Sequence, residues 1–326
     1  MNSLATLSYE QLLSSRGMRK WFWSLVRHAL IKYAGDPACR MQVHSRAIRL
    51  PLSHALPSLL HEHPFFDRLP IRVSNYLRAR DGRLVCIDVG ANVGDTLAAL
   101  YRPEAADDRF LAIEANPRFT KYLIENWSWA HNVLIEGVMC GAESGSGTYE
   151  ILERMGTASV VSTGSGSSLQ VRALDDLANI HSEFSRVNFL KVDTSGHDFP
   201  VLSGARGVIA ARQPALLFES SAATDERYIS SCTTAFAQLR SAGYRDLLLY
   251  DNFGYLMGRY SLAANDDFRK LLFYQLTSPF YYFYVLVMKD ADLDRFEAAE
   301  VELFVNHAPD SRLKEAAREA SRHALV

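Results

Sequence analysis

The sequence predicts an α/β protein whose core is a mostly parallel sheet of seven strands flanked by helices. From residue 84 onward, short apolar runs alternate with helical stretches, the pattern of strands joined by crossover helices. The 326 residues, 48% of them apolar, suffice for one large core with an appendage. The four cysteines are scattered without a C-x-x-C pair, so neither a metal site nor a disulfide framework is predicted.

Residues 1–80 are predicted to form a helical and proline-rich extension. A helical pattern over residues 8–34 is interrupted at Gly17. Prolines then crowd a short stretch, in which we expect neither regular helix nor central strand; they are Pro37, Pro51, Pro57, Pro64 and Pro70.

Residues 81–290 are predicted to hold the core and residues 291–326 a C-terminal helical segment that breaks at Pro309. We expect the seven strands at 84–89, 110–115, 133–138, 187–193, 215–219, 245–250 and 280–288. We expect helices at 94–100, 117–130, 199–211 and 225–242. Seven of the eighteen glycines lie between 137 and 166, which predicts an irregular insertion, and 168–173 alternates like an exposed strand.

The first expected strand runs into a glycine-containing loop. Gly90 and Gly94 let the backbone approach a ligand closely, and the helix that follows offers unpaired N–H groups. A dinucleotide loop, G-x-G-x-x-G, would need a third glycine where Asp95 stands, and an acid there repels a pyrophosphate. An amino-acid tail beside a sulfonium tolerates that acid better. The loop therefore favours S-adenosylmethionine (SAM) over NAD, the alternative being a tight turn without a ligand.

Glu114 ends the second expected strand, 24 residues after Gly90. This is about where a nucleotide-binding α/β sheet places the acid that binds the ribose hydroxyls, since a carboxylate accepts two hydrogen bonds. The alternative is an exposed acid at a strand end.

Several segments together resemble the FkbM family of SAM-dependent methyltransferases. They are Asp88-Val-Gly-Ala-Asn-Val-Gly-Asp-Thr96, Glu114-Ala-Asn-Pro117, Leu190-Lys-Val-Asp-Thr-Ser-Gly-His-Asp198 and Val201-Leu-Ser-Gly-Ala205, followed by blocks at 174–177, 217–219 and 250–254. The resemblance covers roughly 84–290. It departs from the family at Ser195, where many members carry Glu.

The resemblance implies a Rossmann-like class I methyltransferase fold that binds SAM. It implies that the methionine end of SAM is lined by Asp88, Gly90, Ala91, Asn92, Gly94 and Thr96. It also implies that Glu114, with Asn116 beside it, holds the ribose, and that backbone around Val138 and Met139 borders the adenine.

Two acids are expected near the methyl group. Asp193, also counted among the cofactor-binding residues, and Glu219 end strands that should neighbour the first, at the edge where open α/β sheets bind ligands. Lys191 shares a strand face with Asp193 and is expected in a structural ion pair. His197 is the candidate catalytic base, together with Asp193 as the second catalytic candidate; a structural or positioning role for His197 is the alternative.

Two further features stay open. His54, His61 and His63 are ordinary loop histidines or a wall of the acceptor pocket, since i, i+2 spacing is not that of a helical metal site. The Gly/Ser/Thr stretch 162–168 is either a lid or a flexible loop.

The charge pattern bears on partners. The 35 Lys and Arg against 37 Asp and Glu give a net charge of −2, which argues against nucleic acid as the main partner. Residues 11–35 nevertheless hold five Lys or Arg and no acid, around Trp21, Phe22 and Trp23. This pattern is typical of peripheral membrane contact, or of a helix docked on its own domain or on a second subunit. The longest wholly apolar run, nine residues, is far below the roughly 20 that span a bilayer, so a cytoplasmic location, free or at the inner membrane face, is expected.

The predicted function is O-methylation of a hydroxyl on a small-molecule or glycan acceptor. The family resemblance implies a sugar of a surface polysaccharide or glycolipid, or a natural product. The alternatives are a non-catalytic SAM-binding scaffold in a biosynthetic complex and an NAD-dependent or nucleotide-sugar oxidoreductase. Asn92, Asp95 and the lack of a Tyr-x-x-x-Lys pair disfavour the oxidoreductase. The oligomeric state stays open.

Overall fold

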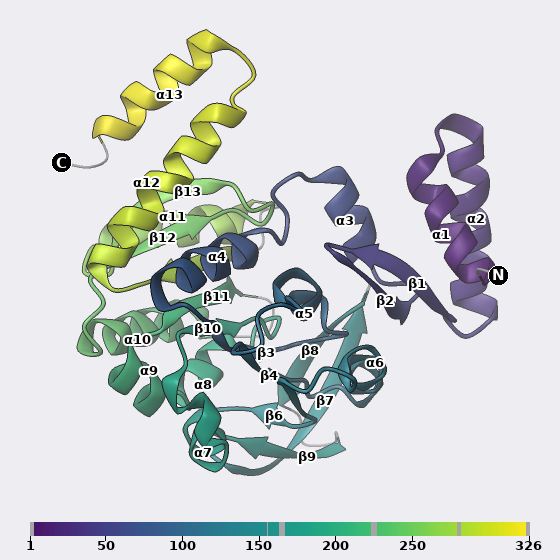
Figure 1. The fold of residues 1–326 in the computed structure, drawn as a ribbon, viewed down its shortest axis with the longest axis horizontal. Helices are drawn as coiled ribbons and strands as arrows, with labels where there is room; N and C mark the ends of the chain where they lie inside the picture. Colours follow the sequence, from purple (N-terminus) through teal and green to yellow (C-terminus); the bar gives the residue numbers. More distant parts are fainter. Residues whose placement is uncertain (1–2, 155, 163–166, 223–226, 279–281, 324–326) are drawn as a thin grey trace.

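The computed structural model describes residues 3–154, 156–162, 167–222, 227–278 and 282–323 (Figure 1). Its main sheet has eight strands in the order β13-β12-β14-β11-β10-β3-β4-β5. In that order they are Leu256–Ser261, Asp246–Tyr250, Tyr282–Val287, Ala215–Ser221, Phe189–Val192, Val85–Val89, Arg109–Ile113 and Val133–Glu136. The five strands from β11 to β5 are parallel, and β14, β12 and β13 pair in antiparallel fashion.

The predicted α/β fold is confirmed, whereas the predicted number of strands was one too low. The eighth strand, β13, extends the sheet at its edge beyond β12. Its residues are half-buried or exposed and include Gly258. A strand without a buried apolar run gives no periodic signal, and this explains why the sequence did not reveal it.

Helices cover both faces of the sheet, because strand side chains alternate between two apolar clusters. One face is covered by α4 (Leu69–Asp81), α5 (Asp95–Leu100), α6 (Pro117–Trp127) and α12 (Asp290–His307). The other is covered by α7 (Leu174–Ile180), a 3-10 helix (Ser182–Arg186), α8 (Asp198–Ser203), α9 (Arg206–Arg212), α10 (Tyr228–Ser241) and α11 (Asn265–Thr277). The expected helix 199–211 is split at Gly204, where an added Cβ would lie 2.0 Å from the carbonyl oxygen of Gly141.

The expectation of an irregular insertion at 137–166 was wrong. The segment forms most of a second sheet, in the order β6-β9-β7-β8. Its strands are β6 (Met139–Cys140), β7 (Gly145–Arg154), β8 (Thr157–Ser162) and β9 (Ser167–Arg172). Most of its glycines lie in or beside these strands, and Gly156, at φ +87°, forms the β7–β8 turn. The Gly/Ser/Thr stretch 162–168 was expected to be a lid or a flexible loop, and its residues 163–166 lie outside the described residues.

The N-terminal extension is more regular than its prolines suggest. It contains α1 (Leu4–Ser14), α2 (Gly17–Tyr33), β1 (Ala38–Val43), β2 (Arg46–Pro51) and α3 (Leu56–Glu62) before α4. The predicted interruption at Gly17 is confirmed, but the expectation of no regular helix in the proline stretch was wrong. Pro57 and Pro70 stand in the first turns of α3 and α4, where a missing N–H leaves no hydrogen bond unmade.

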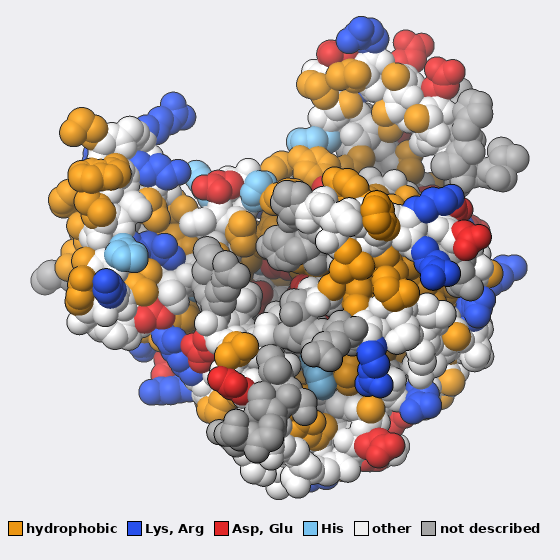
Figure 2. Space-filling model, turned by 180° about the vertical axis from the view of Figure 1, so that it is seen from behind, with side chains coloured by type: hydrophobic (Ala, Val, Ile, Leu, Met, Phe, Trp, Pro, Cys, Tyr) orange, Lys and Arg blue, Asp and Glu red, His pale blue; other side chains and the backbone are white. Residues whose placement is uncertain are grey.

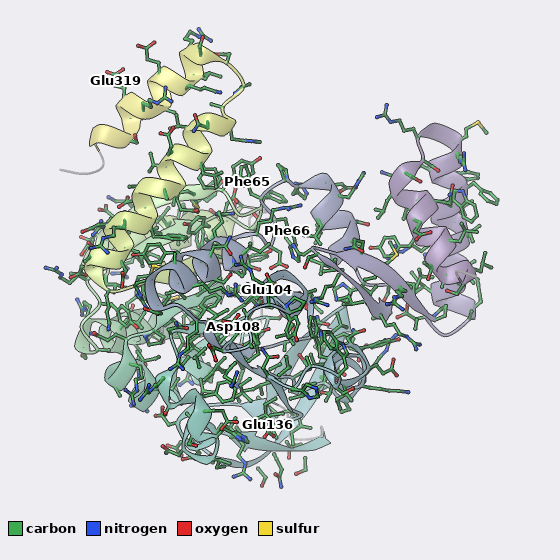
Figure 3. The ribbon with its side chains drawn as sticks, viewed as in Figure 1. Phe65, Phe66, Glu104, Asp108, Glu136 and Glu319 are labelled. Carbon is green, nitrogen blue, oxygen red and sulfur yellow. The ribbon has the colours of Figure 1, made fainter. Side chains whose placement is uncertain are left out.

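The last part of the N-terminal extension and the C-terminal helix α12 meet beside the sheet. Arg72 of α4 donates two hydrogen bonds, of 2.6 and 2.9 Å, to Glu300 of α12. Phe65, labelled in Figure 3, lies with its ring tilted against that of Phe304 of the same helix, at 4.7 Å between ring centroids. The predicted break at Pro309 separates α12 from α13 (Ser311–His323). Among the helices that the structure describes, none is long and apolar enough to cross a membrane.

Candidate functional site

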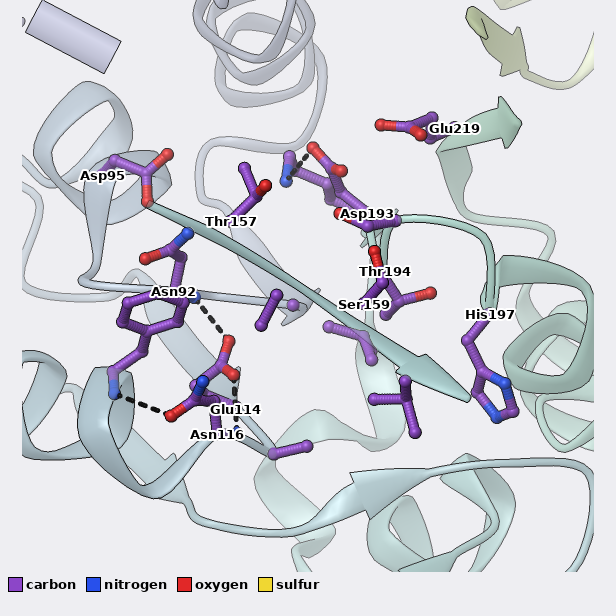
Figure 4. A pocket seen from close by; sticks show the side chains of 18 of the residues that line it. Asn92, Asp95, Glu114, Asn116, Thr157, Ser159, Asp193, Thr194, His197 and Glu219 are labelled. Atoms are coloured by element: carbon purple, nitrogen blue, oxygen red, sulfur yellow. Dashed lines mark hydrogen bonds and ion pairs between the residues drawn. The ribbon is translucent and has the colours of Figure 1, made fainter. Parts of the chain in front are cut away.

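A cavity of about 380 Å³ opens at the carboxyl ends of β3, β4, β10 and β11 (Figure 4). Parallel strands end at a common edge, and register places Lys191 of β10 beside Asp88 of β3. The predicted site residues on the cavity wall are Gly90, Asn92, Glu114, Asn116, Val138, Asp193 and His197, together with Glu219. The other predicted residues, Asp88, Ala91, Gly94 and Thr96, are buried behind this wall.

The loop after β3 is held in one conformation by its neighbours. The N–H groups of Gly90 and Ala91 donate to the carbonyl oxygen of Ile113 at 2.9 and 3.0 Å, and the indole N–H of Trp127 donates to that of Gly94 at 3.0 Å. Gly90 has φ +86°, and a Cβ there would lie 1.9 Å from the carbonyl oxygen of Asp193. Glycine is therefore required where β3 and β10 approach each other.

Glu114 is fixed by backbone donors on both of its oxygens. Oε2 accepts from the N–H of Asn92 at 2.8 Å, and Oε1 accepts from the N–H of Asn116 at 2.7 Å. Each oxygen keeps a second lone pair. Burial raises the pKa of Glu114 to about 7. The side chain of Asn116 is engaged elsewhere, because it caps α6 and donates to Glu153 at 2.8 Å.

Lys191 forms the predicted ion pair, with two partners. Its Nζ lies 3.1 Å from Asp193 Oδ2 and 3.4 Å from Asp88 Oδ1. Burial alone would lower the pKa of Lys191, but the charges of Asp193 and Asp88 raise it well above its ordinary value. Tyr284 of β14 donates a long hydrogen bond of 3.4 Å to Asp193 Oδ2. Burial, and next the charge of Asp193, raise the pKa of Glu219.

His197 lies at a different side of the cavity from this acidic group. Its ring centroid is 6.4 Å from that of Tyr149 on β7, and Figure 4 shows it pointing away from Asp193 and Glu219. The loop before it is held by Asp198, whose carboxylate accepts from the N–H groups of Thr194 and Gly196 at 3.2 Å each. Burial raises the pKa of Asp198 to about 7.

Part of the wall comes from segments that the sequence did not assign to the site. They contribute Phe66 and Asp67 of the extension, Thr157 to Val160 of β8, and Tyr282 and Tyr284 of β14. Tyr282 and Tyr284 are two residues apart on one strand, a spacing that places both on one face and was the available signal. No sequence signal indicated that β8 contributes to the wall, because this strand was not expected.

The three histidines of the extension separate. His54 lines the cavity, as one of the two interpretations proposed, and burial lowers its pKa to about 4. His63 stacks on Phe253 at 4.3 Å between ring centroids, and His61 is exposed. No group of three potential metal-binding side chains occurs among the residues that the structure describes.

The cavity wall is acidic, and the residues present fit SAM. Its carboxyl groups are those of Asp67, Asp95, Glu114, Asp193 and Glu219, and Lys191 is the one Lys or Arg among the described residues of the wall. Such a wall is complementary to a ligand that carries a sulfonium and an ammonium group. Asn92 Oδ1 is buried and accepts no hydrogen bond from a described residue, so it offers an ammonium group an acceptor.

The sheet order, the glycine loop after β3 and the acid at the end of β4 define a Rossmann-like class I methyltransferase. Residues 88–245 match the family model described as the Methyltransferase FkbM domain. This part of the chain is an FkbM methyltransferase domain. The resemblance stated from the motifs is thereby confirmed, and so is SAM as the cofactor of the family.

Solved structures similar to this chain include proteins described as methyltransferases. Methyltransferase FkbM from Methylobacillus flagellatus KT is 16% identical with a TM-score of 0.39. The match covers 72% of this chain and 52% of that protein, so this chain spans about half of its length. The Methanococcus jannaschii fibrillarin pre-rRNA processing protein is 11% identical with a TM-score of 0.38, over 77% and 88%. Precorrin-6y C5,15-methyltransferase from Geobacter metallireducens GS-15 is 13% identical with a TM-score of 0.32, over 69% and 89%. The curated proteins include no match to this chain.

Proposed function

We propose that this protein is a SAM-dependent methyltransferase that O-methylates a hydroxyl of a sugar, in a surface polysaccharide or glycolipid, or of a natural product. The observation that carries the proposal is the cavity at the strand ends, where five carboxyl groups accompany the single Lys191. A pyrophosphate-containing ligand such as NAD would bring two negative charges into this wall, at a cost that a sulfonium ligand avoids.

The residues on the wall suggest how SAM is held. The loop from Gly90 to Gly94 would bind the methionine end, with Asn92 Oδ1 accepting from its ammonium group. Glu114 would accept hydrogen bonds from the ribose hydroxyls through the lone pairs that its backbone donors leave free. Val138 and Met139 border the remaining space, as expected for the adenine. When bound, SAM supplies a methyl group on positively charged sulfur, which an oxygen can attack in line.

The acidic group formed by Asp193 and Glu219 supports a hydroxyl acceptor. Both carboxyl groups line the cavity. Asp193 can accept the hydrogen bond of a hydroxyl and then its proton, and Glu219, whose pKa burial raises, can orient the hydroxyl through a hydrogen bond. Tyr282 and Tyr284 line the same part of the wall and give a sugar an apolar surface on which to pack. His197 lines the cavity from the other side, which supports a positioning role more than that of the base.

Calorimetry tests the cofactor assignment. We expect the full chain to bind SAM and its demethylated product, S-adenosylhomocysteine, and to bind NAD at least about a hundredfold more weakly. Glu114→Gln should weaken SAM binding about tenfold or more, because an amide cannot accept from both backbone N–H groups and the ribose. Glu104→Gln, at an exposed position, is the matched control. Equal binding of NAD and SAM would favour the oxidoreductase.

Transfer of labelled methyl groups to a panel of glycans and hydroxylated natural products tests the reaction. A product that carries label on oxygen is the expected result, whereas SAM binding without transfer to any acceptor would favour the scaffold. Once an acceptor is found, Asp193→Asn and Glu219→Gln should lower turnover about a hundredfold or more while SAM binding is retained. Wild-type turnover in His197→Gln would exclude His197 as the base.

A further inference from the structure

Helix α2 carries apolar side chains on two opposite sides. On one side Trp23, Leu30 and Ile31 are partly buried, and the latter two pack against the core cluster. The other side exposes a stripe at the spacing i, i+3, i+4, i+7, which places its members on one helix face. The exposed fractions in this stripe are 85% for Met18, 63% for Trp21, 52% for Phe22 and 48% for Leu25.

Figure 2 shows hydrophobic side chains along the outer edge of the N-terminal hairpin, the side turned away from the sheet. Leu4 and Leu7 of α1 are also exposed. A helix that only docks on its own domain needs one apolar side. The outer stripe therefore calls for a partner outside the chain.

The charges of α2 indicate what that partner is. Residues 11–35 hold Arg16, Arg19, Lys20, Arg27 and Lys32 without any acid. The carboxylate of Asp36, next along the chain, is taken up by Arg118 and Ser53. A second copy of the chain would bring the same cations against these, and a symmetric contact would place like charges together. An anionic lipid surface neutralises them and accepts the aromatic side chains at headgroup level.

We propose that α2 is a peripheral membrane anchor that inserts its stripe of Met18, Trp21, Phe22 and Leu25 into the headgroup region of an anionic bilayer. Arg19 and Lys32 contact phosphate groups, and their long stems lie along the lipid surface. Arg27 is engaged within the chain, where it donates to the carbonyl oxygen of Leu52 at 3.0 Å. Lys20 lies 3.9 Å from the carboxylate of Glu62. The 17-residue helix lies in the plane of the interface, since it is too short and too charged to span the bilayer.

Point variants test this better than a truncation. Tyr9 of α1 is fully buried, and its hydroxyl donates to the carbonyl oxygen of His54 at 2.5 Å, so removing residues 1–35 would also damage the cavity wall. Flotation of the full chain with two kinds of vesicle avoids this problem. The vesicles are phosphatidylcholine alone, and phosphatidylcholine mixed with phosphatidylglycerol.

We expect the protein to float with the anionic vesicles and not with the neutral ones. Trp21→Ser/Phe22→Ser and Arg19→Glu/Lys32→Glu should each reduce the bound fraction about tenfold or more, since each basic side chain near such a surface contributes about fivefold to partitioning. Phe273→Ser/Tyr274→Ser, which replaces an exposed aromatic pair on α11, and Arg269→Glu/Arg312→Glu, at exposed positions, are the matched controls. Thermal unfolding checks that all variants fold.

Three outcomes would overturn the anchor. The wild-type chain does not float with either vesicle; the α2 variants float as well as the wild type; or the control variants lose binding to the same extent. Light scattering tests whether the stripe binds a second copy of the chain instead. If the wild type does not float but forms a dimer, and the α2 variants are monomers, the stripe is a dimer interface. The readout does not involve methyl transfer, so it is independent of the proposed function.

Discussion

The ammonium nitrogen of Lys191 lies 3.1 Å from Oδ2 of Asp193, where the carboxyl end of β10 meets the cavity. Lys191 lies in β10 and Asp193 directly follows this strand, and the same Nζ lies 3.4 Å from Asp88 on the neighbouring strand β3. One cation thus stabilises two carboxylates at the centre of the sheet edge. Because all three groups are fixed by strand pairing, the site has its charge arrangement before any ligand binds.

Removal of this cation should destabilise the fold. Lys191→Met leaves Asp88 and Asp193 without a counter-charge in a buried setting, and we expect the free energy of unfolding to fall by about 3–5 kcal/mol. Urea denaturation measures it, with Lys121→Met on the exposed side of α6 as the control. A Lys191→Met protein as stable as the control would show that the carboxylates do not need this partner.

The raised pKa of Glu114 should appear in the pH dependence of stability. Burial raises this pKa to about 7 from 4.5, so between these values the folded chain keeps a proton that the unfolded chain releases. The contribution of Glu114 to the free energy of unfolding is therefore fully present below about pH 4.5 and is lost as the pH rises to about 7. The total change is about 3 kcal/mol. Urea denaturation of wild type and Glu114→Gln across this range measures the difference.

The comparison isolates one group, since Asp198 and His54 titrate equally in both proteins. We expect the stability of the wild type relative to Glu114→Gln to decline between about pH 5 and pH 7 and to level off above. Parallel curves for the two proteins would mean that Glu114 does not titrate in this range.

Gly90 should not tolerate a side chain. Gly90→Ala combines a left-handed backbone at φ +86° with a Cβ placed 1.9 Å from the carbonyl oxygen of Asp193. We expect a loss of at least about 2 kcal/mol in unfolding free energy and a displaced loop that binds SAM poorly by calorimetry. Gly145→Ala is the matched control, since nothing lies within 4 Å of its added Cβ. Equal stability of the two variants would contradict the close approach of β3 and β10.

The hydroxyl of Tyr9 should matter for the cavity wall. It donates to the carbonyl oxygen of His54, and Tyr9→Phe removes that hydrogen bond while keeping the buried ring. The expected loss is about 1–2 kcal/mol, read as a lowered midpoint of thermal unfolding. Tyr33→Phe, at a residue that is 78% exposed, should leave the midpoint unchanged. If both variants melt alike, the extension does not support the wall through this contact.

The sequence predicted the parts of the site that lie on buried strands. Asp88 and Asp193 end apolar runs whose pairing in a parallel sheet follows from burial on both faces, and Lys191 needed a partner for the same reason. Glu114 was found because its distance along the chain from the glycine loop is fixed by one crossover helix. These features depend on the local apolar pattern of each strand and on the geometry of the strand–helix–strand unit.

The remaining parts of the site depend on contacts between distant segments. His54 meets the turn at Gly156, where an added Cβ would lie 2.5 Å from the imidazole, and no property of either segment indicates the other. The hairpin of β7 and β8 was hidden by glycines that lie within strands. Pro57 and Pro70 were read as helix breakers, although a proline in the first turn is compatible with a helix.

The position of β14 between β11 and β12 has a consequence for biosynthesis. The ribosome completes β11 at Ser221 about 60 residues before it begins β14 at Tyr282, an interval of roughly 3 to 12 seconds. During that time the nascent chain has a parallel half-sheet whose outer strand, apolar along most of its length, has an open edge. The strand that protects this edge arrives late, after β12 and β13, and must insert between neighbours that already exist. We therefore expect the nascent protein to depend on chaperones in the window between these two strands.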